Sequence, residues 1–143
     1  RMESGFLHWG HDISPEENQY QAGLNFAISY KKPFDFIGKE KLLKIRDKKL
    51  DQRFVMLVLK DNTPGKPLLL HEEPIYLDNK IIGKTTSGNY SFNYNKNLSF
   101  GYINSEFSNE QLVDKNLYIE IEKEKYPAEL LLKPLKSNNF KNI

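Results

Sequence analysis

The sequence contains no cysteine, which excludes disulfide bonds, thiolate catalysis and cysteine-ligated zinc or iron–sulfur centres. It has no apolar run of membrane-spanning length and no pattern typical of a signal peptide. Only three of the 21 basic residues are arginine, and 19 acidic residues are interspersed with the basic ones. Because a nucleic-acid surface needs clustered positive charge, we expect no nucleic-acid partner, and the apolar pattern predicts no membrane partner.

The sequence also lacks a complete set of residues for a recognised active site. His8, His11 and Asp12 could ligate a metal ion, but their spacing is not the helical one of zinc hydrolases, and His71 is distant along the chain. Ser87 has no glycine at the spacing of a nucleophile elbow, so the hydroxyls of this segment are interpreted as hydrogen-bonding groups at a strand end. We therefore predict no metal site and no catalytic residue in this chain.

Short alternating segments separated by turn residues dominate the later part of the 143-residue chain. Residues 75–77 and 81–87 form the limbs of a predicted hairpin, which turns at Asp78-Asn79 because these residue types tolerate a positive φ. We expect a break at 87–89, an alternating aromatic segment at 90–94 and a last apolar run at 98–103. This pattern is typical of a small antiparallel barrel or sandwich.

The remaining elements follow from the same rules. Strands are predicted at 53–60, 116–123 and 126–133, with the last two joined by a turn at Glu124-Lys125. A capping box predicts a short helix from Ser14 to Gly23, and strong helix formers predict a second helix over 38–49. Four alternating apolar residues predict a strand over 24–30: Leu24, Phe26, Ile28 and Tyr30.

These segments predict a mainly β protein. We expect residues 51–136 to form a small antiparallel barrel, because short strands dominate after residue 52. Residues 1–50 mix helical and strand patterns and are expected to form a mixed α/β segment packed on the barrel. Residues 137–143 form a polar tail.

Several motifs, in order along the chain, resemble the aminomethyltransferase (glycine cleavage T-protein) superfamily. They are RMESGFLHWGHDI at 1–13, QAGL at 21–24, PFDFIGKE at 33–40, IGKTTSG at 82–88 and GYI at 101–103. The HWG triplet at 8–10, YPA at 126–128 and KPL at 133–135 look closer to the dimethylglycine and sarcosine dehydrogenase branch. Gln21 and Lys41 depart from the family pattern, which has Glu and Ala at these positions.

The resemblance implies a function that this chain performs only in part. It implies that residues 1–50 end a folate-binding domain and that a tetrahydrofolate pocket lies between this domain and its neighbours. The folate-binding candidates are Arg1, Glu3, His8 and Trp9: Arg1 would pair with a folate carboxylate, and Trp9 would stack on the ligand or shape its pocket. The core-plug interpretation of Trp9 stays open. In the family, the catalytic aspartate and, in the dehydrogenase branch, FAD belong to earlier chain.

Three hypotheses follow for the parent protein. It is a dimethylglycine/sarcosine dehydrogenase-like enzyme that passes a one-carbon unit from an N-methyl amine to tetrahydrofolate, or it is a stand-alone aminomethyltransferase. Alternatively, the barrel is a non-catalytic binding or assembly module.

Folate and a small methylated amine are the expected partners, bound with a missing domain, and this chain by itself is expected to be inactive. The resemblance implies a cytoplasmic protein, or one of the mitochondrial matrix in a eukaryote.

The chain begins with Arg1 rather than Met, from which we expect that it was cut from a longer polypeptide. If earlier chain normally covers residues 1–50, some large apolar side chains of this segment should be exposed. We expect this of Phe6, Leu7, Trp9, Phe26, Phe34 and Phe36. Exposure of such side chains would favour self-association of the chain.

Overall fold

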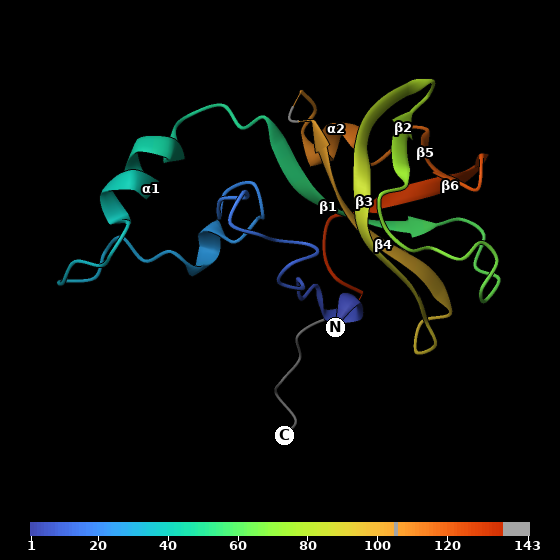
Figure 1. Ribbon diagram of the computed structural model, residues 1–143, viewed down its shortest axis with the longest axis horizontal. Helices are drawn as coiled ribbons and strands as arrows, with labels where there is room; N and C mark the ends of the chain where they lie inside the picture. Colours follow the sequence, from blue (N-terminus) through green and yellow to red (C-terminus); the bar gives the residue numbers. More distant parts are fainter. Residues whose placement is uncertain (105, 136–143) are drawn as a thin grey trace.

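The computed structural model describes residues 1–104 and 106–135, and its main feature is a closed barrel of six antiparallel strands (Figure 1). The order of the strands around the barrel is β1-β4-β3-β2-β5-β6. The strands are β1 (Gln52–Leu59), β2 (Pro74–Leu77), β3 (Lys80–Ser91), β4 (Lys96–Asn104), β5 (Leu117–Ile121) and β6 (Glu124–Leu131). The mainly β fold with an antiparallel barrel is therefore confirmed, whereas the predicted tail at 137–143 lies outside the described residues.

The apolar run of β1 is buried on both faces of the sheet. Val55, Leu57 and Leu59 belong to the larger core cluster, together with Ile75, Ile119 and other residues inside the barrel. Val58 belongs to a second cluster with Met2 and Phe100, against which Met56 packs. This second cluster is covered by η1 (Met2–Ser4), a short 3-10 helix at the start of the chain. Because both faces of β1 are covered, its sequence is continuously apolar rather than alternating.

The barrel hairpins differ in detail from those predicted. The two-residue turn at Asp78-Asn79 is confirmed by the pairing of Leu77 with Lys80. The turn between β5 and β6 is instead at Glu122-Lys123, where both residues have a positive φ. The predicted break at 87–89 is wrong: β3 continues to Ser91, because a register shift between Thr85 and Ser87 accommodates the irregularity within the strand pairing.

Residues 1–50 contain no β-strand of their own. The predicted strand at 24–30 is wrong: the segment holds a 3-10 turn, η2 (Asn25–Ala27), and no neighbouring strand pairs with it. The predicted helix at 14–23 is also wrong. Ser14 and Glu17 do form reciprocal hydrogen bonds typical of a cap, but the residues that follow form successive turns.

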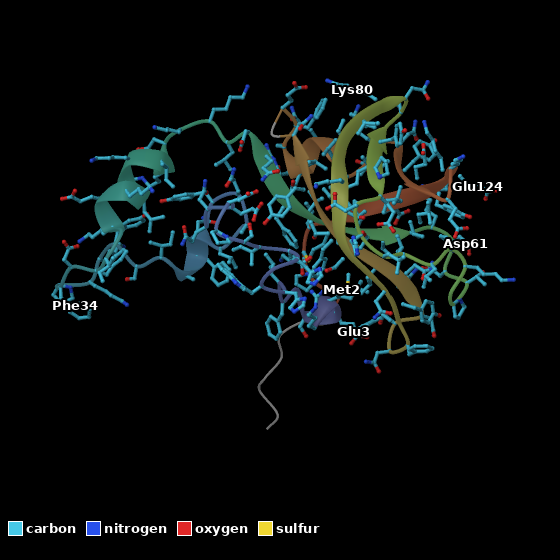
Figure 2. All side chains as sticks on the ribbon, in the orientation of Figure 1. Met2, Glu3, Phe34, Asp61, Lys80 and Glu124 are labelled. Carbon is cyan, nitrogen blue, oxygen red and sulfur yellow. The ribbon has the colours of Figure 1, made fainter. Side chains whose placement is uncertain are left out.

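The predicted helix at 38–49 is confirmed as α1 (Lys39–Arg46). None of its eight residues is buried, and Figure 1 shows that it stands apart from the barrel on an extended limb. Phe34 lies near the tip of this limb, far from the barrel (Figure 2). The helix is therefore held by contacts with the residues before it, such as the 3.4 Å hydrogen bond from the Tyr20 hydroxyl to the Leu42 carbonyl, rather than by burial against the barrel.

The short helix α2 (Asn109–Leu112) closes one end of the barrel by burying Leu112 in the core. Its start is fixed by a capping box: the Ser108 hydroxyl accepts a hydrogen bond from the Gln111 N–H at 3.2 Å, and the Gln111 side chain accepts one from the Ser108 N–H at 2.8 Å. We expect Ser108→Ala to lower the free energy of unfolding by about 1 kcal/mol in urea denaturation. Lys115→Ala, at an exposed side chain nearby, is the matched control, and equal stability of both variants would contradict this role.

Candidate functional site

The carboxylate of Asp12 is the centre of the contact between the N-terminal segment and the barrel. Its side chain is fully buried, and the Arg1 guanidinium donates a hydrogen bond to Oδ2 at 2.8 Å. The backbone N–H of His8 donates to the same oxygen at 2.8 Å, and the Thr86 hydroxyl on β3 donates to Oδ1 at 2.6 Å. A buried charge is stable only when it is paired and hydrogen-bonded in this way.

Three further interactions hold the same segment. The Tyr102 hydroxyl donates to the backbone carbonyl of Asp12 at 2.8 Å, and burial, with the nearby Glu17 and Asp12 carboxylates, raises the pKa of Tyr102 well above its usual range. Arg1 Nη2 donates to the Ser87 hydroxyl at 2.8 Å. The Arg1 guanidinium also lies 5.7 Å from the centroid of the Phe100 ring. Arg1 therefore connects the start of the chain to both β3 and β4.

This docking forms an open cleft of about 450 Å³ between the N-terminal segment, the loop before β2 and the end of β3. Such a volume is within the range of small-molecule sites. We call it the polar cleft. Apolar side chains, Met2, Leu70 and Leu98, form part of its lining. The charged and ring-bearing residues of the lining are Arg1, Glu3, His8, His11, His71 and Tyr90.

Glu3 lies at the end of the polar cleft near the hairpin between β3 and β4. The Ser91 hydroxyl donates to Glu3 Oε1 at 2.6 Å, and the Asn93 amide donates to Oε2 at 2.9 Å. Figure 2 shows Met2 and Glu3 at the N-terminal end of the chain, below the barrel. The Glu3 carboxylate thus joins η1 to the hairpin, much as Asp12 joins the following loop to β3.

The structure brings together three of the four predicted folate-binding residues. Arg1, Glu3 and His8 line the polar cleft. Trp9 does not line it: with Phe6 and Phe26 it lines a second, largely apolar cleft of about 810 Å³, which we call the apolar cleft. Whether any of the four binds folate stays a prediction.

The expected exposure of apolar residues in the N-terminal segment is confirmed. Phe6, Trp9 and Phe26 expose 55%, 66% and 81% of their surface, and Phe34 is also exposed. Leu7 and Phe36 are half-buried. The exposed Trp9 shows that this residue is not a core plug, which answers the question that its sequence context left open.

Sequence reasoning missed the role of Asp12 and the contribution of Ser87 to the cleft wall. It did interpret the hydroxyls of this segment as hydrogen-bonding groups at a strand end. The bonds of Thr86 to Asp12 and of Ser87 to Arg1 confirm the hydrogen bonding, but both residues lie within β3 rather than at its end. The only sequence feature that could have indicated the contact between Asp12 and Arg1 was the opposite charge of their side chains. Because 11 positions separate the two residues, this signal alone does not indicate a contact.

Membrane-spanning helices and clusters of metal-ligating side chains are both absent from the residues that the structure describes. Over 1–104 and 106–135, no helix is long and apolar enough to cross a membrane. In the same ranges, no three or more His, Cys, Asp or Glu residues are grouped so that they could hold a metal ion. The chemistry that the polar cleft offers is therefore hydrogen bonding, charge and planar side-chain faces.

Comparisons with known proteins identify the fold and the family. Residues 52–136 match the family described as the glycine cleavage T-protein C-terminal barrel domain. The crystal structure of the glycine cleavage system aminomethyltransferase T from Bartonella henselae superposes with a TM-score of 0.78 at 21% identity, over 95% of this chain and 37% of that one. This likeness confirms the barrel fold.

Two curated relatives match almost the whole chain. Mitochondrial dimethylglycine dehydrogenase of Rattus norvegicus is 35% identical over 135 residues, which are 94% of this chain and 15% of the relative. An aminomethyltransferase of Listeria welshimeri is 31% identical over 134 residues, which are 94% of this chain and 35% of the relative. The chain thus spans less than a sixth of the length of the dimethylglycine dehydrogenase and about a third of the length of the aminomethyltransferase. The chain belongs to the glycine cleavage T-protein C-terminal barrel family, which aminomethyltransferases and dimethylglycine dehydrogenases share, as its motifs predicted.

Proposed function

We propose that this chain forms one wall of a tetrahydrofolate site in a protein that passes a one-carbon unit from an N-methyl amine to tetrahydrofolate. The observation that supports this proposal is the meeting of Arg1, Glu3 and His8 at one open cleft in a chain of this family. These residues come from the segment that precedes the barrel, whereas the opposite wall comes from β3. The site therefore depends on both parts of the chain.

The residues of the polar cleft fit part of a folate molecule. A guanidinium has five N–H donors. Among the described residues, the Phe6 carbonyl, Asp12 and Ser87 each accept one hydrogen bond from Arg1, so two of its five donors are left for a ligand carboxylate. The Arg1 side chain is 35% exposed, and the cleft is open to solvent. The imidazole and phenol rings of the cleft offer flat faces suited to an aromatic ring.

Tetrahydrofolate, when bound, supplies the acceptor for the one-carbon unit. The residues of this chain bind and orient the ligand: Arg1 is held by Asp12 in a position where it can pair with a carboxylate, and Glu3 is held by Ser91 and Asn93 at the far end of the cleft. We assign no catalytic residue to this chain. The sequence has no Gly-rich dinucleotide fingerprint, so we assign no step through FAD to it either. Any flavin, and the methylated amine, would bind with earlier chain of a dehydrogenase-like parent.

We expect Arg1→Lys to weaken the binding of 5-formyltetrahydrofolate about tenfold in isothermal titration calorimetry, because lysine keeps the charge but lacks the planar fork that pairs with a carboxylate. Arg46→Lys is the matched control, since Arg46 lies on α1 and pairs with the exposed Asp47. Absence of binding to the native protein would overturn the proposed function. Equal binding by both variants would remove Arg1 from the site.

The apolar cleft supports a second candidate function, a binding or assembly module. Its exposed rings, Phe6, Trp9 and Phe26, form a surface of the kind that marks interaction sites. Self-association through this surface remains a proposal, and sedimentation at several concentrations tests it. A monomer at every concentration would contradict it.

A further inference from the structure

We infer that the polar cleft contains a slot with planar walls, formed by the stacked rings of His8 and His11 on one side and by Tyr90 on the other, which binds the flat ring of an aromatic ligand. This inference rests on the proposed function for the choice of ligand. It assigns recognition of the ligand's ring to His8, His11 and Tyr90, in addition to the charged residues Arg1 and Glu3. The walls come from two parts of the chain that are about 80 positions apart.

The histidine wall is an ordered stack. The rings of His8 and His11 are 4.8 Å apart between centroids and are nearly parallel, with an interplanar angle of 12°. His71, from the loop before β2, lies 6.2 Å from His11 and is tilted by 54° against it. The backbone of the loop is fixed as well, because the N–H groups of His11 and Asp12 donate to the His8 carbonyl at 3.2 Å and 2.8 Å. His8 and His11 are both exposed to solvent, and both line the cleft.

The orientation of the stack favours ring binding over metal binding. The lone pairs of imidazole nitrogens lie in the plane of each ring. In two stacked, nearly parallel rings the lone pairs lie in two separate planes and do not meet at one point, whereas metal ligation requires several of them to converge. An outer face of the stack, by contrast, is suited to offset stacking with another aromatic ring.

Tyr90 lines the same cleft and is held in place by contacts of its own. It lies near the end of β3, its N–H donates a hydrogen bond to Asn89 Oδ1 at 2.8 Å, and its hydroxyl donates to Asn95 Oδ1 at 3.4 Å. The Phe92 ring packs edge-on against Tyr90, with centroids 5.0 Å apart and an angle of 74°. A half-buried ring with these contacts at both ends presents a preorganised flat surface.

The charged side chains of the cleft are held in place by other residues of the protein. Arg1 pairs with the buried Asp12, and Glu3 accepts hydrogen bonds from Ser91 and Asn93. These groups can orient the polar ends of a ligand, whereas the flat ring faces of the cleft offer a surface for its aromatic part. The ligand class that these surfaces fit is a planar aromatic ring that carries hydrogen-bonding groups. Two parts of a folate meet this description: the aminobenzoyl ring and the pterin ring.

The three histidines of the sequence all line the polar cleft, which makes their ring resonances specific reporters of this site. We propose to label histidine with ¹³C and ¹⁵N and to titrate the protein separately with N-(4-aminobenzoyl)-glutamate, pterin-6-carboxylate and glutamate. We expect at least one of the two aromatic probes to shift the ring resonances in a saturable way, and glutamate to leave them in place. Which aromatic probe binds identifies the part of the folate that the slot takes. Equal shifts with glutamate, or no shift with either of these aromatic probes and none with adenosine, would overturn the slot.

Variants of the hairpin test the second wall. We expect Tyr90→Ala to weaken binding of the aromatic probe about tenfold, and Tyr90→Phe to restore it to within about twofold of native, because phenylalanine keeps the flat face. Tyr94→Ala is the matched control: Tyr94 lies in the same hairpin but does not line the cleft. Equal affinity of the Tyr90→Ala and Tyr94→Ala variants would overturn the role of Tyr90.

The slot and the proposed function fail in distinguishable ways. If 5-formyltetrahydrofolate binds the native protein but Tyr90→Ala leaves its affinity unchanged, the proposed function stands and the slot is wrong. If both folate fragments fail to bind, whereas adenosine shifts the histidine resonances and Tyr90→Ala abolishes this shift, the slot stands with another planar ligand and the proposed function is wrong.

Discussion

Asp12→Ala is expected to lower the free energy of unfolding by about 3 kcal/mol in urea denaturation. The substitution removes a fully buried carboxylate that accepts hydrogen bonds from Arg1, the His8 N–H and the Thr86 hydroxyl. The loss leaves the His8 N–H and the Thr86 hydroxyl without this acceptor and Arg1 without its counter-charge. Because Arg1 is 35% exposed, water can solvate part of that charge, which keeps the expected loss at the lower end of the range for a broken buried pair.

The same substitution should also disturb the polar cleft, because Asp12 attaches the histidine loop to β3. We expect the ring resonances of the histidines to shift in Asp12→Ala. Asp47→Ala is the matched control: it removes the carboxylate of an exposed pair with Arg46 and is expected to change stability by no more than about 1 kcal/mol. A loss below about 1 kcal/mol in Asp12→Ala, with unchanged histidine resonances, would show that the segment is held to the barrel by other contacts.

Gly83→Ala is expected to destabilise the barrel by about 3 kcal/mol, because β3 and β4 approach too closely there for a side chain. A Cβ atom at Gly83 would lie 2.0 Å from the Tyr102 carbonyl oxygen and 2.7 Å from Ile103 Cα. Both contacts are with the backbone of β4, so a change of side-chain rotamer cannot relieve them. The two strands would have to separate where Gly83 is paired with Ile103.

The matched control for Gly83→Ala is Lys84→Ala at the next residue of β3. The Lys84 side chain is exposed, and its pair with Glu72 lies at the surface, so we expect its loss to cost at most about 1 kcal/mol. Urea denaturation of both variants checks the difference. Similar stabilities for Gly83→Ala and Lys84→Ala would mean that the strands have room to relax at this position.

The errors of sequence interpretation have a common physical cause in residues 14–30. The alternation of Leu24, Phe26 and Ile28 satisfies the rule for a strand, yet a strand also needs a partner for its backbone groups. In the closed barrel, both edges of β1 are occupied by β4 and β6, and no strand edge is left for this segment to join. The Ser14 cap likewise has its expected hydrogen bonds with Glu17, but the Asn18 side chain then accepts hydrogen bonds from the N–H groups of Tyr20 and Gln21, which favours turns over a helix.

The local features of this protein were determined by its sequence alone. Period-two alternation and turn residues determine the barrel strands, helix formers determine α1, and the ordered motifs identify the family. The division of the chain at residues 50 and 136 remains a prediction. These features could be predicted because each depends on residues a few positions apart.

Only the tertiary structure decided which residues share the candidate site. Arg1 and Ser87 are 86 positions apart, and Asp12 and Thr86 are 74 apart, yet both pairs are hydrogen-bonded. Trp9 lies next to His8 in sequence, yet the two side chains line different clefts. The chain turns directly after them, at Gly10, where φ is +91°. Such contacts depend on closure of the barrel and on docking of the first 13 residues against β3 and β4. A one-dimensional pattern carries no record of that docking, because it is stabilised by the burial of Met2 and by the hydrogen bonds of Asp12, and the barrel strands involved form far along the chain.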